Sequence, residues 1–157
     1  MMATEQPDGT SAISPVVKTR VVPIEPAAAF HLFTERMGEW WPTLTHSIEE
    51  AEVVGVRFEG RVGGRVVELV ADGTEWAWAD VLAWDPPHRM VLSWHPNKEP
   101  RAASTIEVTL TPVDGGTELR LEHRGWEEFG ESGRELRENY ETGWEPVLAM
   151  YVAAAGA

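Results

Sequence analysis

The sequence has 157 residues, the usual size of a single domain, so one sizeable hydrophobic core is expected rather than two. Its 13 basic and 26 acidic side chains give a formal net charge of -13. A field of this sign repels a nucleic-acid backbone and an anionic membrane surface, so neither is expected as a partner. Because the chain has no cysteine, disulfides and thiolate metal sites are excluded.

The N-terminal end predicts a tail rather than a targeting segment. Residues 1–15 are polar, contain Pro, Gly and Ser, and lack the basic and apolar stretches of a signal peptide. We expect these residues to be disordered and residues 16–157 to form a single domain with a cytoplasmic location. A membrane helix needs roughly 18 apolar residues, and the nearest candidate, residues 147–157, is shorter.

The first elements are expected to be a strand and a helix. Residues 16–23 are rich in β-branched side chains, which favours a strand. Pro26 suits the first turn of a helix, and apolar residues then recur at helical spacing as far as Gly38, where the helix is expected to end. The segment from residue 39 to residue 50 is predicted to be either irregular or a short helix.

The middle of the chain predicts six strands joined in hairpins. Apolar and polar residues alternate in short runs, and Gly-Gly and Asp-Gly pairs mark the turns. The runs begin near residues 51, 65, 75, 88, 104 and 117. In the first run Val54, Val56 and Phe58 are expected to share a face; in the third, one face is expected to carry Trp76, Trp78, Asp80, Leu82 and Trp84.

Three polar residues of these strands have expected positions. His123 continues the alternation of two apolar residues before it, which places it on the dry face of the last strand. There it is either a buried histidine with a satisfied hydrogen bond or a polar group that lines a pocket. Arg65 and Glu68 project to opposite faces after a Gly-Gly turn, and both are expected on the surface.

A long helix is predicted from residue 133 to residue 152. At 1.5 Å per residue it is about 30 Å long, enough to cross a whole sheet. Pro146 predicts a kink within it. Its apolar stripe consists of Leu136, Tyr140, Trp144, Val147, Leu148 and Tyr151.

The order of these elements predicts an α+β helix-grip fold. A sheet with one dry face needs a cover, and only the last helix has sufficient length and apolar width. We therefore expect a curved antiparallel sheet of about six to seven strands wrapped around the C-terminal helix, with a short helical pair after the first strand.

Several segments carry a family resemblance. GGRVVE (63–68), DGTEWAW (72–78), VLAWDPPHRMVLSW (81–94) and GGTELRLEHRGW (115–126) resemble the START-like (SRPBCC) superfamily. More narrowly, the chain is similar to the branch named after the activator of the ninety-kilodalton heat-shock protein ATPase, a stress-response co-chaperone. The resemblance implies the helix-grip fold, in a superfamily that includes lipid carriers, hormone receptors and polyketide cyclases. In the eukaryotic co-chaperone a separate N-terminal domain contacts the chaperone, whereas a short polar segment precedes Val16 here, so no chaperone partner is expected.

The sequence contains no catalytic or metal-binding motif that would name a reaction. No two of the five histidines have the i, i+2 or i, i+4 spacing of a metal pair, and there is no G-x-S-x-G elbow for a serine nucleophile. No catalytic residue, metal or cofactor is therefore predicted.

The function predicted from the sequence is binding of a small apolar or amphipathic molecule in a cavity between the last helix and the sheet. Eight Trp are unusual beside two Tyr and four Phe, and indoles line pockets as readily as they fill cores. An enzyme of cyclase, dehydratase or hydrolase type and a protein-interaction module are the alternatives, and a homodimer is left open. The expected ligand-binding residues are Trp41, Trp78, His123, Tyr140, Trp144 and Leu148, with His123 as the polar anchor.

Overall fold

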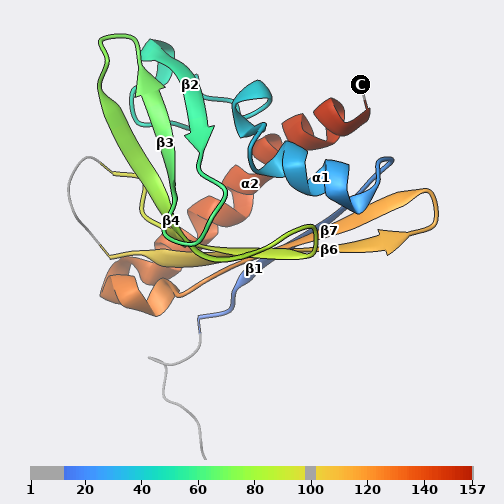
Figure 1. Ribbon diagram of the computed structural model, residues 1–157. Coiled ribbons are helices and arrows are strands. Elements are labelled where there is room, and N and C mark those ends of the chain that lie inside the picture. The colour runs from blue at the N-terminus through green and yellow to red at the C-terminus, as the bar shows by residue number, and fades with distance from the viewer. Residues whose placement is uncertain (1–12, 98–101, 157) are drawn as a thin grey trace, which may run out of the picture.

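The computed structural model describes residues 13–97 and 102–156, and within them it shows the predicted α+β helix-grip fold (Figure 1). Seven strands form one antiparallel sheet in the order β1-β7-β6-β5-β4-β3-β2. The predicted tail lies outside the described residues for positions 1–12. The strands are β1 (Val16–Val22), β2 (Val53–Phe58), β3 (Arg65–Val70), β4 (Glu75–Asp85), β5 (Arg89–Trp94), β6 (Ser104–Val113) and β7 (Gly116–Arg124).

The helices lie on the concave side of the curled sheet. Helix α2 (Gly133–Gly156) runs through the curve between the β2–β4 part of the sheet and the β1, β6 and β7 part, with α1 (Pro26–Phe33) beside it (Figure 1). Short 3-10 turns are η1 (Met37–Glu39), η2 (Glu50–Glu52) and η3 (Trp126–Ser132). In the part of the chain that is described, no helix has both the length and the apolar character needed to cross a membrane.

The core forms where regular periodicity predicted it. The apolar residues of β6 and β7 are buried at alternate positions, and Leu121 is fully buried. On α2 the stripe packs onto this face, with Trp144, Leu148 and Tyr151 buried and Tyr140 half-buried. The Tyr151 hydroxyl donates to the carbonyl oxygen of Ala29 at 2.9 Å, which ties α2 to α1.

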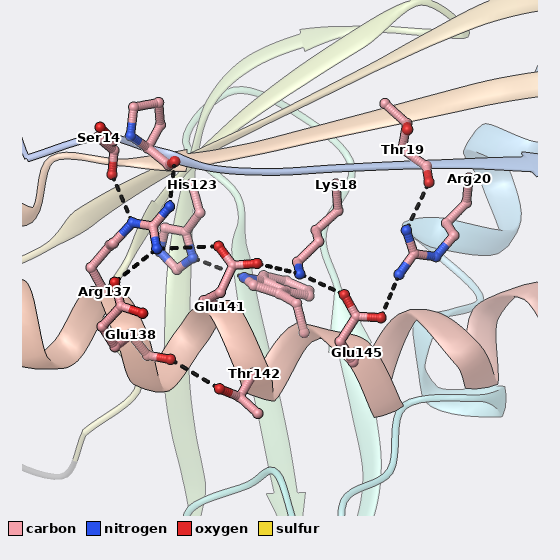
Figure 2. Close-up of polar contacts among 12 residues, drawn as sticks. Ser14, Lys18, Thr19, Arg20, His123, Arg137, Glu138, Glu141, Thr142 and Glu145 are labelled. Atoms are coloured by element: carbon pink, nitrogen blue, oxygen red, sulfur yellow. Dashed lines mark hydrogen bonds and ion pairs between the residues drawn. The ribbon is translucent and has the colours of Figure 1, made fainter.

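Strand β1 is fastened to α2 by ion pairs (Figure 2). The ammonium of Lys18 reaches between Glu141 and Glu145, and Arg20 also contacts Glu145, at 2.8 Å. Burial alone would lower the pKa of Lys18, but the hydrogen bonds and negative charges of the two glutamates outweigh it and raise the pKa. Nearer the start of α2, the Arg137 guanidinium donates to the backbone oxygens of Ser14 and Pro15, which precede β1.

Helix α1 is shorter than predicted. It ends at Phe33 instead of continuing to Gly38, because Thr34 leaves the helical region with φ -99° and ψ -88°. The Thr34 backbone N–H and hydroxyl both donate to the carbonyl oxygen of Phe30, at 3.0 and 2.8 Å, and such a second bond from a threonine side chain often bends a helix. Met37 then begins η1. Pro146, where a kink is predicted, lies inside α2, and the helix continues through it to Gly156.

Two predicted alternations are wrong because β-bulges shift the phase. In β2 the register shifts between Val53 and Gly55, and Val54, expected to share a face with Phe58, is 70% exposed whereas Phe58 is buried. In β4 the shifts fall opposite Val66/Val67 and between Val81 and Ala83. The residues of β4 that belong to the core or pack against it are therefore Trp78, Ala79, Val81 and Trp84, whereas Leu82 is exposed and Asp80 half-buried.

Candidate ligand-binding site

A cavity of about 300 Å³ lies between α2, the sheet and the segment that follows η1. A hollow of about 210 Å³ adjoins it and has four lining residues in common with it. The cavity is lined by Trp41, His46, Trp94, Asn139, Tyr140, Gly143, Trp144 and Val147. The shared residues are Trp41, His46, Trp94 and Tyr140, and the hollow adds Thr45, Ser47, Ile48, Trp78 and Pro96.

Three indoles form the apolar wall. The ring centroids of Trp41 and Trp94 are 5.9 Å apart, and Trp144 lies 5.9 Å from Trp41 and 6.4 Å from Trp94. The Trp41 and Trp144 planes meet at 86° and the Trp94 and Trp144 planes at 39°, so the rings present surfaces in different directions. Trp78 backs this wall, 5.2 Å from Trp41.

The N–H group of each of these indoles is occupied by a protein acceptor. Trp41 Nε1 donates to the carbonyl oxygen of His46 at 2.7 Å, and Trp94 Nε1 to the Tyr140 hydroxyl at 3.1 Å. Trp144 Nε1 donates to His123 Nδ1 at 3.0 Å. The indoles of the cavity wall therefore contribute carbon surface rather than hydrogen-bond donors.

The segment that carries His46 is held to the sheet by Glu68. Contrary to the expected surface position, Glu68 is fully buried, because residues 47–50 fold over it. Its carboxylate accepts hydrogen bonds from the backbone N–H groups of Ile48 and Glu49 at 2.8 and 2.9 Å, and from Trp78 Nε1 at 2.6 Å. Three donors at this distance compensate a buried carboxylate for the water it has lost. Arg65 is exposed, as expected.

His123 is fully buried behind Trp144. Its Nδ1 accepts the Trp144 N–H, so the ring proton lies on Nε2, which contacts the Ser104 hydroxyl at 2.7 Å. The hydroxyl is in turn 3.4 Å from the carbonyl oxygen of Trp94. Burial lowers the pKa of His123 to about 3. The ring is therefore neutral near pH 7, and both of its nitrogens are used within the protein.

The structure brings together three of the six residues expected from the sequence. Trp41, Tyr140 and Trp144 line the cavity, and Trp78 lines the adjoining hollow. His123 and Leu148 are fully buried and are not among the lining residues.

Sequence reasoning missed the polar residues of the cavity. Asn139 is an exposed residue of α2, and half-buried His46 lies in an irregular segment that has no periodicity to place it. His46 Nδ1 is 2.7 Å from the Thr45 hydroxyl. The one available signal was Gly143: a glycine within an amphipathic helix leaves space on its surface, and a Cβ at this position meets no atom within 4 Å.

Metal-ligating side chains do not gather at the cavity. Across residues 13–97 and 102–156 there is no group of three His, Cys, Asp or Glu side chains able to hold a metal ion. His46 is the only such residue of the lining.

Seven antiparallel strands curled around a long C-terminal helix, with a cavity between them, define a helix-grip protein of the START-like superfamily. The family model described as Activator of Hsp90 ATPase homolog 1-like protein matches residues 23–155, and the chain belongs to this family. Among curated proteins no match to the chain is found.

Solved structures share the fold. Protein MLL2253 from Mesorhizobium loti is 23% identical with a TM-score of 0.62, and the match covers 89% of this chain and 95% of that one. CalU16 from Micromonospora echinospora is 20% identical with a TM-score of 0.54, over 87% and 70%. A structure described as an anthrahydroquino-γ-pyrone synthase, Txn09, complexed with SUM is 30% identical with a TM-score of 0.57, over 91% and 97%.

Proposed function

We propose that this protein binds a small, largely apolar or amphipathic molecule in the cavity between α2 and the sheet. The observation that carries the proposal is the cavity itself, about 300 Å³ in volume and walled by three indoles, with Asn139 and His46 as polar groups. Ligand pockets are typically concave, about 300–1,000 Å³ in volume, and mostly apolar with a few polar groups that fix orientation.

Filling the cavity tests the proposal. The uncharged naphthalene dye prodan should show saturable energy transfer from tryptophan on binding, and Gly143→Leu should weaken that binding about ten-fold or more. The side chain of Leu would enter the space that is open at Gly143. Because leucine is a better helix former than glycine by about 0.8 kcal/mol, the variant should fold at least as well as the parent protein.

Thr142→Leu is the matched control, since Thr142 is the exposed neighbour on α2 and does not line the cavity. It adds the same side chain to the same helix, and dye affinity should stay within about two-fold of the parent value. The proposal fails if prodan shows no saturable transfer, or if Gly143→Leu binds it as well as Thr142→Leu does.

Catalysis on the bound molecule is a second candidate. It is favoured by the 30% identity to a chain described as a synthase, and by a histidine at the cavity with its Nε2 atom unpartnered among the described residues. Small molecules released from the purified protein and identified by mass spectrometry would supply the compound to assay. Conversion by the parent protein that His46→Gln abolishes, with binding retained, would support proton transfer by His46; binding without conversion would support a carrier.

A further inference from the structure

We propose that the cavity prefers an organic cation, an apolar or aromatic body that carries an ammonium group, over uncharged and anionic molecules of the same shape. The inference rests on the proposed function and adds the charge of the ligand to it. Three features of the molecule support this preference: the chemistry of the indole wall, the charges of the lining, and the positions of the nearest basic groups.

The wall is suited to a cation because of the atoms it presents. An anion is bound through hydrogen-bond donors, but the indole N–H groups of Trp41, Trp94 and Trp144 are committed to His46, Tyr140 and His123. What remains is aromatic carbon, and the face of an indole ring attracts a cation more strongly than that of any other aromatic side chain. Rings at 39° and 86° to one another can contact a ligand from more than one side.

The charges of the protein act in the same direction. The eight lining residues include no Lys, Arg, Asp or Glu, and the whole chain has a formal net charge of -13. A cationic ligand is therefore attracted at long range and meets no positive side chain at the cavity, whereas an anion is repelled at long range and finds no counter-charge.

The basic groups along the contact between β1 and α2 are committed elsewhere. Lys18, Arg20 and Arg137 lie where β1 meets α2, and Figure 2 shows them paired with Glu141, Glu145 and backbone oxygens. None of the three lines the cavity, and neither does Arg134, the other basic residue of α2, so this helix supplies the cavity with no positive side chain.

Three para-substituted phenols, two of them of the same shape, test the preference. They are para-hydroxyphenyltrimethylammonium, its uncharged isostere para-tert-butylphenol, and the anion para-hydroxybenzoate. Calorimetric titration of the intact protein at pH 7, where the phenol of the ammonium probe stays protonated, should give an affinity for this probe about two- to thirty-fold higher than for the isostere, the range expected for cation–π contact. The anion should bind more weakly than either.

The salt dependence of binding distinguishes cation–π contact from long-range electrostatic attraction by the net charge. The titrations are repeated at about 0.15 M and about 1 M salt, between which the Debye length falls from about 8 to about 3 Å. A preference that persists at high salt supports the aromatic cation site. A preference that disappears there overturns it, because the net charge alone would then explain the difference.

Two substitutions at one exposed position provide matched variants. Asn139→Lys places a positive charge at the rim of the cavity, and Asn139→Met is an uncharged residue of similar length. The lysine should lower the affinity for the ammonium probe about three-fold or more relative to the methionine, and change the affinity for the isostere by less than about two-fold. Trp94→Phe, which keeps a smaller aromatic ring in the wall, should reduce the ammonium preference while the isostere still binds.

The outcomes distinguish this inference from the proposed function. If para-tert-butylphenol binds as tightly as the ammonium probe or more tightly, the cavity binds small molecules but the preference for cations is wrong. If none of the three probes binds and prodan also fails, both proposals are overturned.

Discussion

Replacing His123 by glutamine should make the free energy of unfolding less sensitive to acid. His123 is fully buried with its pKa lowered to about 3 by burial, whereas an unfolded histidine has a pKa near 6.5. Above about pH 6.5 neither state binds this proton. As the pH falls through 6.5, the unfolded state gains a proton that the folded state does not take up until about pH 3, so stability falls across that window.

The size of the effect follows from the two pKa values. Each pH unit between them contributes about 1.4 kcal/mol, so the free energy of unfolding should lose about 2 kcal/mol from this residue at pH 5 and about 3 kcal/mol at pH 4. His123→Gln keeps a polar side chain beside Ser104 and Trp144 but has no proton to gain.

Urea unfolding followed by circular dichroism at pH 7.5, 5 and 4 measures this difference. Protonation of carboxylates also lowers the free energy of unfolding in acid, but it does so equally in both proteins, so this contribution cancels in the comparison. The parent protein should therefore lose about 2 kcal/mol more than His123→Gln between pH 7.5 and pH 5. Parallel losses in the two proteins would refute the reasoning, because His123 would then titrate equally in the folded and unfolded states.

Three further substitutions test the core, the buried carboxylate and the ion pairs between β1 and α2. Leu121→Ala should lower the free energy of unfolding by about 2–5 kcal/mol in urea melts, since Leu121 is fully buried beneath α2; a loss under about 1 kcal/mol would contradict that packing. Glu68→Gln leaves at least one of three buried N–H donors facing another donor, so we expect a loss of about 1–3 kcal/mol, with faster amide exchange at Ile48 and Glu49 than elsewhere. Lys18→Met should lower stability by about 1 kcal/mol at low salt and by less at high salt, because its glutamate partners are partly exposed; a loss independent of salt would argue against the ion pairs.

Regular periodicity explains the part of the fold that could be predicted from the sequence. In β6 and β7 each residue opposes one residue of its neighbour, so the side-chain period stays at two and the alternation placed Leu121 and His123 correctly. The stripe on α2 was predictable for the same reason, because the helix keeps one period from Gly133 to Gly156.

Bulges and buried partners explain what could not be predicted. A β-bulge depends on how two strands pair. The amino-acid sequence of β4 alone therefore does not show that Leu82 breaks the alternation of its strand. Glu68 appeared to be a surface residue because its compensating N–H groups come from residues 48 and 49, about twenty positions away and without regular structure. His46 was missed because it belongs to the same irregular segment.

The hydrogen bonds of the indoles also explain why the cavity stays open. An apolar space lined by large side chains tends to be filled when those side chains change rotamer, because contacts across an empty gap are lost. Trp41 and Trp144 cannot turn inward without breaking hydrogen bonds of 2.7 and 3.0 Å to His46 and His123. For Trp144 this would leave a buried acceptor unpaired, which opposes collapse by about 1–3 kcal/mol. His123 thus has a role at the site although it lies outside the lining, because its neutral ring accepts the hydrogen bond that holds Trp144 in place. The low pKa of His123 weakens the fold in acid, but it also keeps the ring neutral, and therefore able to accept this bond, near neutral pH.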